Sequence, residues 1–195
     1  MALNASTSNR GKLANMRYSN LSPLLVLTGL LSVHPFAFAQ DKKLEDILAY
    51  ARISENLGTS GQMKYDQIET IKKAGFEVIV NLATANKVGN AMEGFLVTDQ
   101  GMTYVQIPVD FDKPALRDLD MFMDVMDANQ DRKVHVHCGS SKRASTFTYL
   151  YRTLRLGVPE DTARKALEAV WDPSKEKQWA GLIEQARARA ATKAR

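Results

Sequence analysis

The stretch Val134-His-Val-His-Cys138-Gly-Ser-Ser-Lys-Arg143-Ala-Ser145 decides how this chain can fold and which chemistry it can carry. Val134 and Val136 alternate with polar residues, which predicts a strand. A turn of small residues follows, and residues 144–156 then have the apolar spacing of a helix. The amides of such a turn and the positive end of the helix together form a site for an anion. The only cysteine, Cys138, stands at the edge of this site, which favours its thiolate.

The first 39 of the 195 residues have the pattern of a secretory signal peptide. Three basic residues and no acidic residue precede the apolar run at 21–33, which is too short to span a bilayer. Ala37-Phe-Ala39 then has the small-x-small form that signal peptidase cleaves. We therefore expect export to the periplasm or the medium, with cleavage before Gln40 and no stable membrane association afterwards. The alternatives are a short membrane anchor and a buried helix.

Charge and cysteine content narrow the function of residues 40–195. These residues carry 23 basic and 22 acidic side chains, a net charge of +1, so nothing in them indicates a nucleic-acid partner. A single cysteine in an oxidising compartment has no internal disulfide partner. Free cysteines are most often buried and inert, but the turn that follows Cys138 favours a chemical role.

Residues 40–195 alternate helices with strands, which predicts one α/β domain with a central, mostly parallel sheet flanked by helices. Strands are expected at 76–82, 102–109 and 133–138. Helices are expected at 40–56 (running into a short extended piece at Ile53), 65–74, 92–98, 111–126, 144–156, 159–171 and 176–191. We also expect a turn at 57–61, Asp112 as an N-cap, and Trp171 and Trp179 as anchors for the last helices.

The sequence around Cys138 resembles the cysteine-dependent phosphatases of the tyrosine and dual-specificity type. It has His-Cys after a strand, a small-residue turn, an arginine, and a serine at the head of a helix. Upstream, Gly75-Phe-Glu-Val-Ile-Val-Asn-Leu82 is similar to a family strand that ends in Asn-Leu. Tyr104-Val-Gln-Ile-Pro-Val-Asp110 is similar to the strand that ends near the general acid. The resemblance covers about residues 57–171, and it is nearest to compact bacterial phosphatase domains, including those described as beta-lactamase-hydrolase-like.

This resemblance implies a two-step phosphoryl transfer that needs no cofactor. Cys138 would attack the phosphorus of a phosphorylated small molecule or phosphoprotein, and water would hydrolyse the phosphocysteine. Arg143 would bind two oxygens, Asp110 would protonate the leaving group, and Ser145 would hydrogen-bond the sulfur. His137 would hold the loop by a hydrogen bond to the backbone. The amides that bind the remaining oxygens would be those of Gly139, Ser140, Ser141, Lys142, Arg143 and Ala144.

One feature departs from the family pattern. Four residues separate Cys138 from Arg143, where the family has five, and Ala144 stands at the usual place of the arginine. Moving a side chain by one residue at a helix start rotates it by about 100°. Either the loop tightens so that Arg143 still reaches the anion, or that contact is lost and Lys142 offers a point charge with poorer geometry. Three functions stay open: a phosphatase, a non-catalytic phosphate-binding protein, and a rhodanese-like sulfurtransferase, whose loop has this length.

The general acid and the two histidines of the strand at 133–138 each have an alternative assignment. Asp110 is preferred to Asp112 as the general acid, because Asp112 is expected to cap a helix. His135 and His137 point to the same face of their strand, but residues 40–195 contain no other histidine and no cysteine besides Cys138. We therefore expect no metal site and assign His135 to sheet packing.

Overall fold

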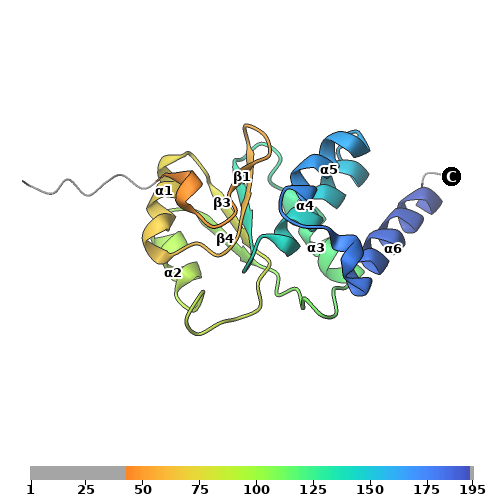
Figure 1. The fold of residues 1–195 in the computed structure, drawn as a ribbon. Coiled ribbons are helices and arrows are strands. Elements are labelled where there is room, and N and C mark those ends of the chain that lie inside the picture. Colours follow the sequence, from red (N-terminus) through yellow and green to blue (C-terminus); the bar gives the residue numbers. More distant parts are fainter. Residues whose placement is uncertain (1–42, 194–195) are drawn as a thin grey trace, which may run out of the picture. The chain divides into compact units, whose positions relative to one another are not determined.

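A five-stranded sheet lies between two groups of helices in the structure, a computed structural model that describes residues 43–193 (Figure 1). The strands are β1 (Ala51–Arg52), β2 (Leu57–Ser60), β3 (Val78–Asn81), β4 (Thr103–Gln106) and β5 (Val134–His137). Their order is β1-β2-β5-β3-β4; β1 is antiparallel to β2, and the other neighbours are parallel. The predicted mostly parallel sheet is confirmed. The expected signal peptide and its cleavage site lie outside the described residues.

The helices divide between the two faces of the sheet (Figure 1). One face carries the short helices η1 (Leu44–Asp46), η2 (Tyr65–Gln67), α1 (Ile68–Lys73) and α2 (Glu93–Asp99). The other carries α3 (Leu116–Asp127), α4 (Lys142–Leu154), α5 (Glu160–Glu168), η3 (Pro173–Lys175) and α6 (Lys177–Lys193). None of the helices within residues 43–193 is long and apolar enough to cross a membrane.

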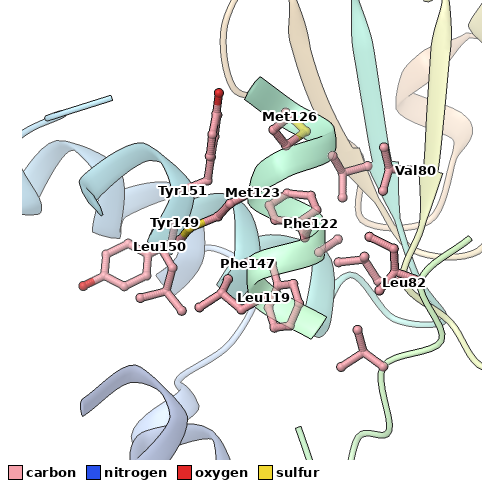
Figure 2. Close-up of a cluster of buried hydrophobic side chains, with 14 of the residues drawn as sticks. Val80, Leu82, Leu119, Phe122, Met123, Met126, Phe147, Tyr149, Leu150 and Tyr151 are labelled. Carbon is pink, nitrogen blue, oxygen red and sulfur yellow. The ribbon is translucent and has the colours of Figure 1, made fainter. Parts of the chain in front are cut away.

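Each face of the sheet has its own apolar cluster, so β3 is buried on both sides, as its continuous apolar sequence predicts. Val78 and Val80 belong to the cluster under α3 and α4, and Ile79 belongs to the one under α1 and α2. Figure 2 shows Phe122 of α3 beside Phe147 of α4, with their ring centroids 5.6 Å apart. These two clusters hold the sheet that carries Cys138 at the end of its central strand.

Two predictions for the beginning of the domain are wrong. In place of the expected helix at 40–56, the described residues form only η1 and β1, and the left-handed backbone of Ala49 (φ 48°) prevents a continuous helix. In place of the expected turn at 57–61, the chain forms β2, which pairs with β1 and β5. Gly58 is required there, because a Cβ would lie 2.9 Å from the Phe76 ring. Tertiary packing therefore overrides a local composition that is typical of turns.

The bounds of two helices near the site also differ from the prediction. Asp112 does not cap α3, which begins at Leu116 with Ala115 as its N-cap, so the residues after β4 form a longer loop. Helix α4 begins at Lys142, two residues earlier than expected. The predicted strands at β3, β4 and β5 and the other predicted helices are found with shorter or slightly shifted bounds.

Trp179 anchors α6, as predicted. Its side chain is fully buried, packs against Phe111, Phe147 and Trp171, and donates an indole hydrogen bond to the carbonyl of Phe111 (2.9 Å). Because Phe111 directly follows Asp110, this bond also fixes the loop that carries the predicted general acid.

Candidate active site

Cys138 follows the last residue of β5, at the carboxyl edge of the parallel strands. Its amide donates to the carbonyl of Ser60 in β2 (3.3 Å), and the carbonyl of His137 accepts from the amide of Leu82 after β3 (2.8 Å). Both neighbouring strands therefore hold the peptide before the sulfur. The cysteine is fully buried, at the floor of the loop formed by residues 138–143, which we call the cysteine loop.

The cysteine loop turns directly into α4. Ser141 adopts a left-handed backbone (φ 66°), and its carbonyl accepts the first helical bond, from the amide of Ser145 (2.8 Å). The amides of residues 139–144 precede that bond, and within residues 43–193 no backbone acceptor takes them up. Free amides at a helix start attract anions, and the helix dipole adds to them. The predicted amide site is thus assembled around Cys138.

Arg143 lies in the first turn of α4 and reaches across the loop. Its Nη1 donates to the carbonyl of Val109 (2.8 Å). Its Nη2 lies 3.5 Å from the position that a Cβ would occupy on Gly139, so the guanidinium is folded back over the loop. Within the described range, no carboxylate lies within ion-pair distance of Arg143. Its other donors therefore remain available for an anion.

Lys142 is held by aromatic rings. Its Nζ lies 5.6 Å from the centroid of Phe111 and 5.1 Å from that of Trp171, both within the range of cation–π attraction. Trp171 is only partly buried and donates its indole hydrogen to Thr146 of α4 (3.2 Å). It thus contacts the loop as well as anchoring the C-terminal helices. The ammonium of Lys142 is a weaker candidate than Arg143 for contacting the anion.

Asp110 lies between two residues that contact the cysteine loop. Val109 accepts the hydrogen bond from Arg143, and Phe111 lies under the ammonium of Lys142. The Asp110 side chain is exposed and accepts a hydrogen bond from the amide of Asp112 (2.9 Å). The prediction that Asp112 caps a helix is wrong, so capping does not distinguish the two aspartates. Asp110 remains the preferred acid because both of its neighbours are fixed to the loop.

Ser145 and Ala144 take different positions. The Ser145 hydroxyl donates to the carbonyl of Lys142 (3.1 Å), so the predicted bond to sulfur requires this hydroxyl to turn. Ala144 is fully buried and can offer only its amide to an anion. Ser140 is exposed, and the buried hydroxyl of Ser141 has no hydrogen-bond partner among the described residues.

The two histidines lie on one face of β5, as predicted, but His137 does not bind backbone. Its Nε2 lies 2.7 Å from Oε1 of Glu93, and both side chains are fully buried. His135 fills the predicted packing role: it hydrogen-bonds Ser60 (2.8 Å) and lies against Tyr50 and Phe76. Burial, and then the neighbouring His137, lower the pKa of His135, so it is neutral.

Glu93 and Gln62 are part of this site, and the sequence analysis missed both. Oε2 of Glu93 accepts a hydrogen bond from the side-chain Nε2 of Gln62 (2.5 Å). The backbone N–H of Gln62 donates to the carbonyl of Gly139 in the cysteine loop (3.0 Å). An acidic residue in the first turn of a helix is commonplace, and no local pattern indicates that this one is buried. Within residues 43–193, no group of three histidine, cysteine or acidic side chains is arranged to hold a metal ion.

Comparison with known proteins points to one superfamily. A family model described as "Polymorphic toxin system, DSP-PTPase phosphatase" matches residues 56–154. The chain is 32% identical to a DUF442 protein of Shewanella putrefaciens CN-32, described as a candidate phosphatase; the match covers 75% of this chain and 93% of that one, with a TM-score of 0.69. No curated protein sequence matches at a significant level.

More distant solved structures share the fold. TpbA of P. aeruginosa is 13% identical, with 74% of this chain and 91% of that one covered and a TM-score of 0.58. PTPMT1 is 16% identical, with 73% and 99% covered and a TM-score of 0.56. At these identities the likeness concerns the fold alone.

Substitution of Arg143 tests whether the shifted arginine still serves the site. Arg143→Ala is expected to lower kcat for an aryl phosphate by about 100-fold or more, because charge-assisted donors to a developing anion are strong. Arg143→Lys should recover little, since an ammonium lacks the planar fork that can hold the carbonyl of Val109 and the anion at the same time. Steady-state kinetics would measure both.

The matched control is Lys142→Ala, which removes the neighbouring cation that the aromatic rings hold. Its loss of activity should be much smaller. Equal hydrolysis by Arg143→Ala and the wild-type protein would show that Arg143 does not contact the reacting group.

Proposed function

Because the chain belongs to the family of DSP-PTPase phosphatases of polymorphic toxin systems, and is therefore a cysteine-dependent phosphatase, we propose that it cleaves phosphomonoesters through a phosphocysteine on Cys138. The family membership favours phosphoryl transfer over the sulfurtransferase alternative. The mechanism, the roles of the residues and the location of the protein are inferred from the site and the sequence.

In the first step, the thiolate of Cys138 attacks phosphorus, and a phosphorus–sulfur bond replaces the bond to the ester oxygen. The leaving oxygen takes a proton from Asp110. In the second step, Asp110 accepts a proton from water, and the resulting hydroxide attacks phosphorus. The sulfur departs as a thiolate and inorganic phosphate is released, so the enzyme returns to its starting state without a metal or redox cofactor.

One observation carries the proposal: Arg143 lies over the cysteine loop despite being one residue closer to Cys138 than is usual in the family. The bond from its Nη1 to Val109 and the position of its Nη2 beside Gly139 support a guanidinium that faces the anion site. Within residues 43–193, no acidic side chain forms an ion pair that would draw it away from the loop. This geometry favours catalysis over the alternative of a non-catalytic phosphate-binding protein.

The substrate class follows from what the loop can bind. Amides and a guanidinium recognise a phosphate group, and they do not distinguish a phosphoprotein from a phosphorylated small molecule. Structural neighbours of the same fold have been solved with different phosphorylated ligands: TpbA with pTyr and PTPMT1 with PI(5)P. We therefore assign a phosphomonoester as the substrate. The near-neutral charge of residues 40–195 gives no reason to expect a nucleic-acid partner.

The first test compares the wild-type protein with Cys138→Ser on an aryl phosphate such as p-nitrophenyl phosphate. The wild-type protein is expected to release phosphate, and the serine variant to show no activity above background, because a serine hydroxyl is not ionised at neutral pH and is a much weaker nucleophile. Equal rates, or no activity in either protein, would contradict the phosphatase assignment.

The second test separates the two acidic candidates. Asp110→Asn is expected to lower kcat for phenyl phosphate by about 100-fold or more, because phenolate is a poor leaving group that needs a proton. Asp112→Asn is the matched control and should change kcat little. The reverse order would assign the acid to Asp112. The two variants should differ less on p-nitrophenyl phosphate, whose leaving group departs without protonation.

The third test concerns location. The pattern of residues 1–39 supports export and cleavage, so the protein recovered from the periplasm or medium should have the intact mass of a chain that begins at Gln40. A protein recovered there with Met1 still attached would contradict cleavage.

A further inference from the structure

We propose that Glu93 is a positioning residue of this active site, which holds Cys138 and one amide of the cysteine loop in place by binding His137 and Gln62. The inference rests on the proposed function, since it concerns the same loop. Glu93 itself touches neither the sulfur nor the anion site.

Glu93 gathers donors from three separate segments. Its carboxylate is fully buried at the start of α2. Oε1 lies 2.7 Å from Nε2 of His137 and accepts from Nδ2 of Asn81 (3.1 Å), and Oε2 accepts from Nε2 of Gln62 (2.5 Å). The ends of β5 and β3 and the segment after β2 therefore meet at one charged group.

Burying a carboxylate costs free energy, because the charged group loses its hydration. A carboxylate removed from water is stable only when it is paired and hydrogen-bonded, and apolar side chains of similar volume often stabilise a protein as well or better. Stability alone therefore does not account for a buried glutamate here. Its partners do, because His137 directly precedes the cysteine loop and Gln62 binds it.

The first route to the loop runs through His137. This residue directly precedes Cys138, and its carbonyl is already bonded to Leu82. The bond to Glu93 fixes the imidazole as well, so both the main chain and the side chain next to the nucleophile are held. A tilt of His137 would move the sulfur relative to the amides and Arg143.

The second route runs through Gln62. The side chain of Gln62 is bound to Glu93, and the backbone N–H of Gln62 donates to the carbonyl of Gly139 (3.0 Å). In a planar trans peptide the carbonyl and the following N–H point in opposite directions. The carbonyl of Gly139 that faces Gln62 therefore turns the amide of Ser140 away from Gln62, where it is free for the anion. Loss of the Gln62 contact would let this peptide rotate.

Tyr104 provides a matched control within the same network. Its hydroxyl accepts a hydrogen bond from Asn81 (2.9 Å) and lies close to the Glu93 carboxylate, but among the described residues no hydrogen bond joins it to His137, Gln62 or the cysteine loop. Burial, and then the charge of Glu93, raise the pKa of Tyr104 well above its ordinary value of 10.0, so the phenol is neutral. Tyr104→Phe therefore removes a part-buried hydroxyl beside Glu93 but leaves the hydrogen bonds from Glu93 to His137 and Gln62 in place.

The experiment measures kcat and KM of the wild-type protein, Glu93→Gln and Tyr104→Phe on p-nitrophenyl phosphate, with the melting temperature of each. The amide of Glu93→Gln is uncharged and has one acceptor oxygen, so its NH2 group either faces a donor or forces Gln62 to turn its own amide and give up its bond to the carbonyl of Met63. In both cases the hydrogen bonds that hold Gln62 or His137 are weakened. We expect kcat to fall about tenfold or more, since small misplacements of reacting groups are costly, with a smaller change in KM. Tyr104→Phe should keep both constants near those of the wild-type protein.

Two results would overturn the inference: a folded Glu93→Gln with the wild-type kcat, or equal losses of kcat in Glu93→Gln and Tyr104→Phe. If Glu93→Gln does not fold, Gln62→Met takes its place, because it keeps the side-chain length and removes the donor to Oε2, together with a longer bond from the same nitrogen to the carbonyl of Met63 (3.2 Å). A wild-type kcat in folded Gln62→Met would then count against the second route and the proposal with it. An inactive wild-type protein would contradict the proposed function instead.

Discussion

The pairing of β5 on both sides is the constraint on which the site depends. All four residues of β5 are in register with β2 on one side and with β3 on the other. Hydrogen bonds to both neighbours extend past the end of β5. The carbonyl of Ser60 accepts from the amide of Cys138, and the amide of Leu82 donates to the carbonyl of His137. Cys138 therefore begins its loop from a fixed backbone, with helices packed on both faces of the sheet behind it.

The short spacing between Cys138 and Arg143 is accommodated by the backbone of the loop. Ser141 takes a left-handed conformation, which is uncommon for a residue other than glycine, and α4 starts immediately after it. The helix thus begins early enough for Arg143 to lie in its first turn and reach Val109 across the loop. Positive groups stand on the anion side of the loop, and the buried carboxylate of Glu93 lies on the sheet side, bound to His137.

The sequence predicts those elements whose local residue pattern is typical of one secondary structure. The alternation at Val134 and Val136, the small turn and the helical spacing after it predict β5, the cysteine loop and α4, and the resemblance of this stretch to a phosphatase loop leads to Cys138 and Arg143. Prediction failed where partners distant in sequence decide. Leu57-Gly-Thr-Ser60 has the composition of a turn, yet it is a strand because β1 and β5 pair with it. Glu93 gave no signal, since its burial depends on donors from three other segments.

Whether the shortened cysteine loop forms a phosphatase site is tested most directly by the structure of the protein crystallised with orthovanadate, an anion that imitates the transferring phosphoryl group. We predict vanadium opposite the sulfur of Cys138, with its oxygens bound by the amides of residues 139–144 and by Arg143 through Nη2. Nη1 should remain on the carbonyl of Val109. Vanadate bound elsewhere, or an Arg143 turned out of the loop when the anion is bound, would contradict the claim that the shortened loop still forms a phosphatase site.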